Sequence, residues 1–197
     1  MKIKKKGFLF VLVVIAVSTI GLAITYNKSV RKDKVIQVKK VVKKKPQIKV
    51  PTIDEIQENI LTEWVYNHSN RCSMNTARKI VRLASDYEHR LWLLALIATE
   101  SHFDTHAYSR TGAIGLGQVM SFWIKELKAN NILQRKSDLW DVKPNIEATE
   151  YILDKCLAKA NGNFKASLTY YFGKKSKHYI NKVYLNLGSL VVALNIN

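Results

Sequence analysis

The sequence is poor in acidic residues, cysteine and proline. Its 197 residues include 15 Asp and Glu against 32 Lys and Arg, with two cysteines and three prolines. The two cysteines, Cys72 and Cys156, lie in no spacing typical of a zinc or redox motif. They are either a disulfide, if the domain lies outside the cytoplasm, or two small buried thiols.

The excess positive charge is concentrated near the N-terminus. The first fifty residues contain fourteen Lys and Arg and one acid, Asp33. The isoelectric point of about 9.9 therefore reflects a basic tail and not a basic face of the fold. This distribution argues against a domain that recognises specific nucleic-acid sequences.

An uncharged segment follows the basic N-terminus, residues 1–6. Gly7 to Thr25 contains no charged residue, and as a helix it would be about 28 Å long, close to the thickness of the hydrocarbon core of a bilayer. We expect a transmembrane anchor at residues 7–25, with a cleaved signal peptide as the alternative. Nine basic residues between Lys28 and Lys45 would by themselves place the C-terminal side in the cytoplasm, so function has to decide the orientation.

Residues 26–51 form a lysine-rich linker. Its like charges repel one another, so we expect an extended, solvated tether. A sharper alternative is a basic strip that binds an anionic surface, such as lipid headgroups or wall polymers. Nucleic acid is a weaker alternative, because Asn27 to Pro51 contains no aromatic residue on which bases could stack.

Residues 52–197 show the periodicity of helices. Thr52 and Glu55 fit a capping box, and apolar residues then recur at helical spacing. No segment alternates as a half-buried strand does, and no repeat occurs, so the sequence predicts an all-α domain. The first expected helix begins at Thr52, and the second begins at Ser73 or Asn75. A further helix runs from near Pro144 through Leu157. The others span His89–Ser101, Ser121–Lys128, Phe164–Phe172 and Lys177–Leu194.

Glu100 lies at the end of the most apolar expected helix, which contains the run LWLLALIA. Burial disfavours the charged form of a carboxylic acid, so we expect the pKa of Glu100 to be raised. A neutral acid directed into a cleft can protonate the oxygen that leaves during cleavage of a glycosidic bond. The alternative is a glutamate that extends from the helix end into solvent.

The segment that contains Glu100, TESHFDTHAYSRTGAIGLGQVM, resembles the catalytic signature of the SLT-type lytic transglycosylases, relatives of goose-type lysozyme. LWDVKPNIEATEYIL, ASLTYYFG and HYINKVY resemble later segments of that family, in the same order. Together the matches extend from about Leu91 to Tyr184. The resemblance implies a lysozyme-like helical domain.

The resemblance also implies roles for five residues. Glu100 would be the general acid and then the general base. Ser101 and Gln118 would contribute to the sugar-binding groove. Tyr170 would hydrogen-bond near Glu100 and orient it, and Tyr179 would line or brace the cleft.

The implied reaction is cleavage of the β-1,4 bond between N-acetylmuramic acid and N-acetylglucosamine in peptidoglycan, with formation of 1,6-anhydromuramic ends. It needs no cofactor and no metal. His102 and His106 lie four residues apart, but no third ligand is evident, so we do not expect a metal site. Asp104 is the only other acid nearby in sequence, and the family gives it a structural role.

The match departs from the family pattern at several positions. Gly117 replaces a methionine, Thr149 stands where glycine is common, and Tyr171 and Phe172 replace asparagine and alanine. These changes concern the geometry of the sugar subsites and the rate more than the type of reaction. Two alternatives to the implied function stay open. One is a lysozyme-type hydrolase, and the other is a weakly active or inactive wall-binding assembly factor for an envelope-spanning apparatus.

Peptidoglycan lies outside the inner membrane, so the resemblance places the domain outside the cytoplasm, on the periplasmic or cell-wall side. The expected partners are glycan strands, membrane lipid at the N-terminal helix and an anionic surface at the linker. Local wall remodelling, a secretion or conjugation apparatus, and a phage, including a phage virion membrane, all remain open as settings.

Overall fold

The computed structural model describes residues 52–69 and 71–195, and in this part of the chain every regular element is a helix, which confirms the predicted all-α domain. Isolated bridges join Tyr108 to Ile114 and Ile114 to Val119 without forming a strand. The helices are α1 (Ile53–Asn67), α2 (Met74–Ala84), α3 (Arg90–Ser101), α4 (Ile124–Ala129), α5 (Val142–Lys159), α6 (Phe164–Phe172) and α7 (Lys177–Asn195), with short 3-10 helices η1 (Ser121–Trp123) and η2 (Lys136–Trp140).

The predicted helix boundaries agree closely with the structure. Helix α1 is capped by Thr52, whose side chain accepts a hydrogen bond from the Glu55 backbone N–H at 3.2 Å, so the capping box is confirmed. Ser73 caps α2, which decides between the two expected starts. Helix α5 begins two residues before Pro144, at Val142. These boundaries depend on neighbouring residues, which is why the sequence predicts them well.

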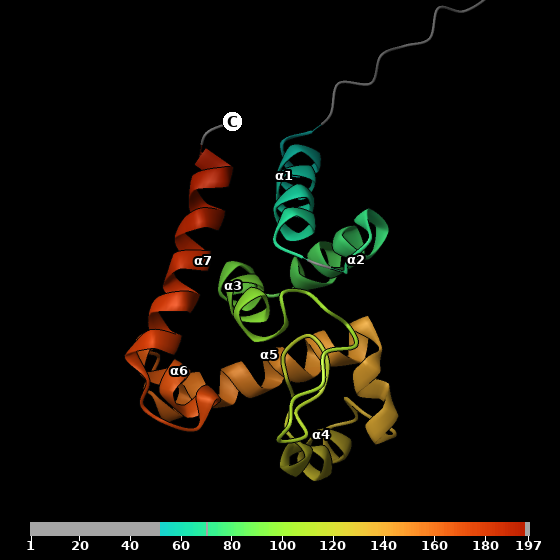
Figure 1. The fold of residues 1–197 in the computed structure, drawn as a ribbon, viewed down its shortest axis with the longest axis vertical. Helices are drawn as coiled ribbons and strands as arrows, with labels where there is room; N and C mark the ends of the chain where they lie inside the picture. Colours follow the sequence, from blue (N-terminus) through green and yellow to red (C-terminus); the bar gives the residue numbers. More distant parts are fainter. Residues whose placement is uncertain (1–51, 70, 196–197) are drawn as a thin grey trace, which may run out of the picture. The chain divides into compact units, whose positions relative to one another are not determined.

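Helix α3 is the central element, as its apolar run predicts. Every residue from Leu93 to Ala98 is buried. In Figure 1, α7 passes on one side of α3, α1 and α2 lie on the other, and α5 passes beneath it; contacts join α3 to α2, α5 and α7. A helix that is buried on all sides provides a rigid base for the residues at its end.

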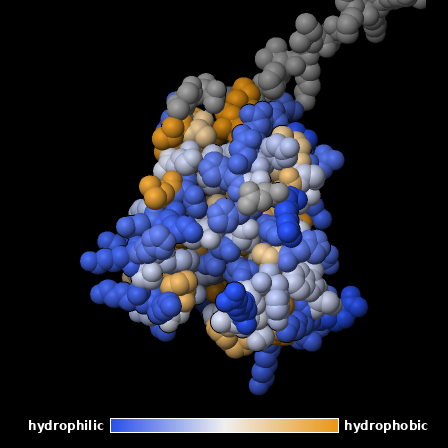
Figure 2. Space-filling model, viewed as in Figure 1, coloured by the Kyte–Doolittle hydropathy of each residue, from blue (hydrophilic) through white to orange (hydrophobic). Residues whose placement is uncertain are grey.

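A second apolar cluster lies between α5 and the segment from the end of α3 to η2. Its members are Ile114, Val119, Leu127, Leu133, Leu139, Ala148, Ile152 and Cys156. These side chains are buried, and the face of the molecule in Figure 2 is mostly hydrophilic. The cluster holds the glycine-rich segment against α5.

The expected anchor, Gly7–Thr25, and the linker, residues 26–51, lie outside the described residues. Among residues 52–69 and 71–195, no helix has both the length and the apolar character that crossing a membrane requires.

The two cysteines are not paired and belong to different apolar clusters. Cys72 belongs to the core cluster around α3, and Cys156 to the second cluster. Both are buried and free, which corresponds to the alternative of two small buried thiols.

Candidate active site

Glu100 is the second-to-last residue of α3, and the chain turns sharply just beyond it. His102 and Phe103 both have left-handed backbone conformations, with φ of 51° and 58°. The Phe103 ring is buried and packs edge-on against Trp64, 5.9 Å between ring centroids. This buried ring fixes the turn, so Glu100 stays on the last turn of a rigid helix.

The environment of Glu100 keeps a proton available near neutral pH. Burial raises the pKa of Glu100 from 4.5 to about 7. The hydroxyl of Tyr179 donates a hydrogen bond to Glu100 Oε1, and this bond and the positive charge of Lys182 oppose the rise. Because the burial effect is larger, both protonation states of Glu100 are populated at pH 7.

Tyr179, on α7, is fixed by its own surroundings. Its ring is 6% exposed and stacks on Phe172 of α6, 4.2 Å between centroids at an interplanar angle of 14°. Burial and the nearby Glu100 carboxylate raise the pKa of Tyr179 far above its ordinary value. Tyr179 therefore stays protonated and acts as a permanent hydrogen-bond donor to Glu100.

The structure corrects the expected role of Tyr170, because the hydroxyl that reaches Glu100 belongs to Tyr179. Tyr170 is 42% exposed, and the Lys159 Nζ lies 4.4 Å from its ring centroid. The next residue, Tyr171, points inward instead. The reason is the helical period, since Tyr171 shares a face of α6 with the buried Leu168 three residues earlier.

An open cleft of about 610 Å³ lies beside Glu100. The predicted groove residues Ser101 and Gln118 both line it. Gln118 Nε2 donates to the carbonyl oxygens of Ala107 and Gly115, at 3.2 and 3.0 Å, so this side chain also holds the loop in shape. The complete lining consists of Arg71, Glu100, Ser101, His102, Asp104, His106, Ala107, Tyr108 and Gln118.

Asn145 of α5 holds the glycine loop in place through hydrogen bonds. It is not among the site residues predicted from the sequence. Its Nδ2 donates to the carbonyl oxygens of Leu139 and Ile114 at 2.7 and 3.1 Å, and its Oδ1 accepts from the Gly117 N–H at 2.9 Å. Gly115 has φ of 70°, and a Cβ there would overlap Asn145 Nδ2. Asn145 lies in the segment LWDVKPNIEATEYIL, so the family resemblance contained the signal that could have found it.

Three departures from the family pattern fit together in the structure. A Cβ on Gly117 would collide with Thr149 Oγ1 and lie 2.6 Å from Thr149 Cγ2, so Thr149 fills the space of a side chain at position 117. The Tyr171 hydroxyl donates to the Gly117 carbonyl oxygen at 2.8 Å. These residues therefore pack as one unit beneath the loop.

A larger hollow, of about 740 Å³, is lined by residues of α1 and α2. Three of its charged side chains pair with one another: Glu58 Oε1 lies 2.9 Å from Arg82 Nε and 3.7 Å from Arg78 Nε. Of these two, we place the functional site in the 610 Å³ cleft, because it is lined by Glu100, an acid with a strongly raised pKa, beside the uncharged polar groups of Ser101 and Gln118.

His102 and His106, weighed as a metal pair, both line this cleft. Across residues 52–69 and 71–195, no cluster of three or more His, Cys, Asp or Glu side chains is arranged to hold a metal ion.

A helical domain with a desolvated glutamate at the end of its central helix, beside a polar cleft, is lysozyme-like. A family model, the transglycosylase SLT domain, matches residues 83–186, more than half of the chain. The chain belongs to the SLT transglycosylase family, whose members are lytic transglycosylases that act on peptidoglycan, and the resemblance is confirmed. A comparison with curated proteins found no match.

Proposed function

We propose that this protein is a peptidoglycan lytic transglycosylase that cleaves the β-1,4 bond between N-acetylmuramic acid and N-acetylglucosamine and leaves 1,6-anhydromuramic ends. The observation that carries the proposal is Glu100, a partly buried acid with a pKa of about 7 that lines an open cleft. An acid with that pKa can donate and accept a proton in one catalytic cycle at neutral pH.

Glu100 acts in two steps. The protonated carboxyl donates its proton to the glycosidic oxygen while the bond from that oxygen to C1 of the muramic sugar breaks. The carboxylate then accepts the proton of the muramic C6 hydroxyl as that oxygen bonds to C1, which restores the protonated acid. Since Tyr179 donates to Oε1, we assign the proton transfers to Oε2. Acid–base catalysis of this kind contributes a factor of about 10² to 10⁴ in rate.

The position of Asp104 favours this mechanism over a hydrolase that uses a second carboxylate as nucleophile. Asp104 lines the same cleft, but its Oδ2 lies 3.6 Å from Arg71 Nη1, and its Oδ1 accepts the His106 backbone N–H at 2.9 Å. Both oxygens therefore have partners that hold the loop. A nucleophilic carboxylate would have to lie about 5 Å from the acid and face the sugar.

The position of Phe172 favours an active enzyme over an inactive assembly factor. Phe172 stacks on Tyr179 and is not one of the residues that line the 610 Å³ cleft. Its bulk therefore supports the tyrosine that bonds Glu100 and leaves that cleft open.

We further propose that the domain acts outside the cytoplasm, anchored by a membrane span at Gly7–Thr25. The support is the uncharged composition of that segment and the location of peptidoglycan, the family's substrate. The protein would then remodel wall for the cell, for a secretion or conjugation apparatus, or for a phage.

The test is to analyse the products of the full-length chain on purified peptidoglycan by mass spectrometry, beside Glu100→Gln. Anhydro-ended products that disappear in the variant are the expected result. Reducing ends that disappear in the variant would instead identify a hydrolase. Uncut glycan with a folded wild-type chain would favour the assembly factor.

A further inference from the structure

Arg71 lines the cleft although it lies outside the segment that matches the family. The family match begins at residue 83, whereas Arg71 belongs to the connection between α1 and α2. It nevertheless lines the same cleft as Glu100 and Gln118. Among the described residues that line the cleft, Arg71 is the one arginine or lysine.

The backbone at Arg71 is held firmly. Ser69 Oγ accepts hydrogen bonds from the backbone N–H groups of Arg71 and Cys72, at 3.2 and 2.8 Å. The Cys72 side chain is buried in the core. These contacts join the backbone at Arg71 to the core, while the Arg71 side chain is exposed.

The guanidinium group has donors to spare for a ligand. Its closest anion is Asp104, with 3.6 Å from Nη1 to Oδ2, and the Arg71 side chain is 75% exposed. A guanidinium carries five N–H donors in a rigid fork, and the contact with Asp104 is made through one nitrogen. Such a fork binds a carboxylate with two parallel hydrogen bonds.

Carboxylates are present on the strand that this cleft would hold. Each N-acetylmuramic acid carries a lactyl group, whose carboxyl group is either linked to a stem peptide or free once the stem has been removed. The stem peptide carries carboxylates of its own. A neutral glycan, such as a chitin oligosaccharide, has none.

We propose that Arg71 binds a carboxylate of the glycan strand, from the stem peptide or the lactyl group, and so sets a preference for acidic strands over neutral glycans. The proposal rests on the proposed function, since it uses the same cleft and the same strand. Arg71, which precedes the segment matched by the family model, would then help to determine which glycan this cleft binds.

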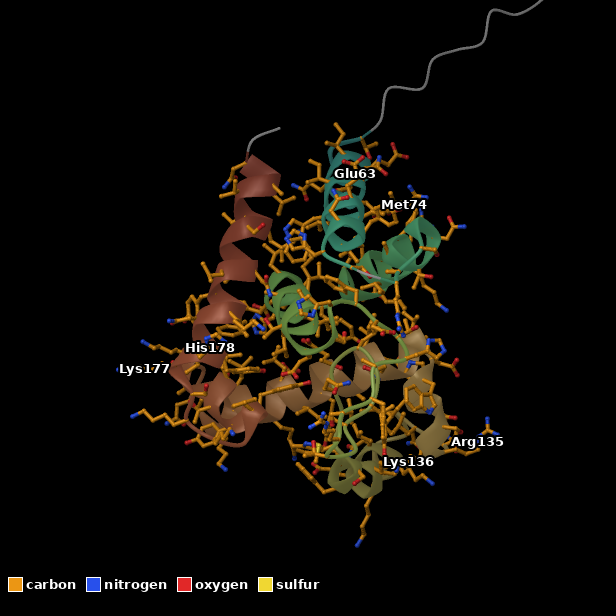
Figure 3. All side chains as sticks on the ribbon, in the orientation of Figure 1. Glu63, Met74, Arg135, Lys136, Lys177 and His178 are labelled. Carbon is orange, nitrogen blue, oxygen red and sulfur yellow. The ribbon has the colours of Figure 1, made fainter. Side chains whose placement is uncertain are left out.

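The test measures binding by full-length chains that carry Glu100→Gln, so that no ligand is cut. The ligands are strands with stem peptides, strands stripped of stems by an amidase, and chitin oligosaccharides. Arg71→Gln and Arg71→Lys are compared with Arg135→Gln. Arg135 is a matched control, because it is also exposed (81%) and pairs with an acid, Asp138, at 3.4 Å, but it lies just before η2 at the edge of the molecule, away from α3 (Figure 3).

The expected result is that Arg71→Gln weakens binding of an acidic strand about tenfold and leaves binding of the neutral glycan within twofold. Arg71→Lys should lose part of the affinity, because the charge remains and the fork is gone. Arg135→Gln should bind all three ligands as the parent does. A loss confined to strands with stems assigns the carboxylate to the peptide, and a loss that includes stripped strands assigns it to the lactyl group.

Equal affinities for the three ligands in all variants, or a loss that includes the neutral glycan, would overturn the proposal. The proposed function is tested separately, because these measurements follow binding without cleavage. A chain that binds acidic strands through Arg71 but makes no anhydro product would contradict the proposed function and leave this inference standing.

Discussion

The surroundings of two glutamates, the partly buried Glu100 and the buried Glu150, differ in two ways. Burial is the largest cause that raises the pKa of each to about 7. Glu100 receives the Tyr179 hydroxyl and lines the 610 Å³ cleft. Glu150, on α5, is 5% exposed, and its Oε2 has no hydrogen-bond partner among the described residues.

Two of the residues around Glu150 are acidic. It lines a smaller hollow, of about 370 Å³, together with Glu147, Asp154 and Tyr87, and the charge of Asp154 adds to the rise in its pKa. A raised pKa is thus shared by an acid that lines the 610 Å³ cleft and an acid that lines this smaller hollow. The hydrogen-bond donor and the polar cleft distinguish the two, which is why we assign catalysis to Glu100.

The largest expected effect is on catalysis. Glu100→Gln should lower kcat by about 10³-fold, because the side chain can no longer transfer a proton. Glu150→Gln should leave kcat within about threefold of the wild type. Release of muropeptides from purified peptidoglycan measures both. Similar losses in the two variants would erase the distinction between the glutamates.

The pH dependence of stability should show what the two glutamates share. The pKa of Glu100 is about 7 in the folded chain and near 4.5 when unfolded, so between these values the folded state binds more protons. The free energy of unfolding therefore falls as pH rises from 4.5 to 7, by up to about 3 kcal/mol. Below pH 4.5 the contribution of Glu100 is constant.

Glu100→Gln should remove this loss, so the variant gains stability relative to wild type at pH 8 but not at pH 4.5. Glu150→Gln should act in the same direction, because its pKa is also raised. Urea unfolding at the two pH values measures the difference. Parallel pH profiles of wild type and Glu100→Gln would show that its pKa is not raised.

The contact between Gly117 and Thr149 connects the environments of Glu100 and Glu150. Thr149 precedes Glu150 on α5, and Gly117 belongs to the loop beside Glu100. Gly117→Ala should lower the free energy of unfolding by about 1–3 kcal/mol, because the new Cβ collides with Thr149. Thr149→Gly in the same chain should restore most of this loss. Thermal unfolding of the single and double variants tests the coupling, and additive effects would contradict it.

Tyr179→Phe removes the hydrogen-bond donor that Glu100 has and Glu150 Oε2 lacks among the described residues. The hydroxyl of Tyr179 lowers the pKa of Glu100, so its removal should raise that pKa above 7. The alkaline limb of the pH–activity profile should then move to higher pH, and kcat should fall about tenfold. Tyr170→Phe is the control, and it should leave the profile unchanged. An unshifted profile in Tyr179→Phe would show that the bond does not tune Glu100.

The smallest effect is expected for Phe172→Ala. Its stacking on Tyr179 is worth about 0.5–1.5 kcal/mol, so kcat should fall only a few-fold as Tyr179 becomes less well placed. Steady-state cleavage of peptidoglycan measures the change. A rise in activity would mean instead that Phe172 obstructs the substrate, as the assembly-factor alternative supposes.

The sequence by itself determined the helices and the identity of the central acid. Capping at Thr52 and Ser73 depends on residues within one turn, and the run before Glu100 is apolar enough to place that helix inside. Interactions of this kind are local, so a pattern of neighbouring residues is sufficient to predict them. The catalytic signature added the glycine loop that follows.

The tertiary structure alone decided which side chains meet at the acid. Tyr179 is 79 residues from Glu100 and reaches it only because α7 packs along α3, while the rotation of α6 turns Tyr171 inward and Tyr170 outward. The contact of Thr149 with Gly117 and the place of Arg71 in the cleft likewise depend on how distant elements pack. Side chains far apart in the chain meet only when whole helices are placed and rotated relative to one another, and no local pattern encodes that placement.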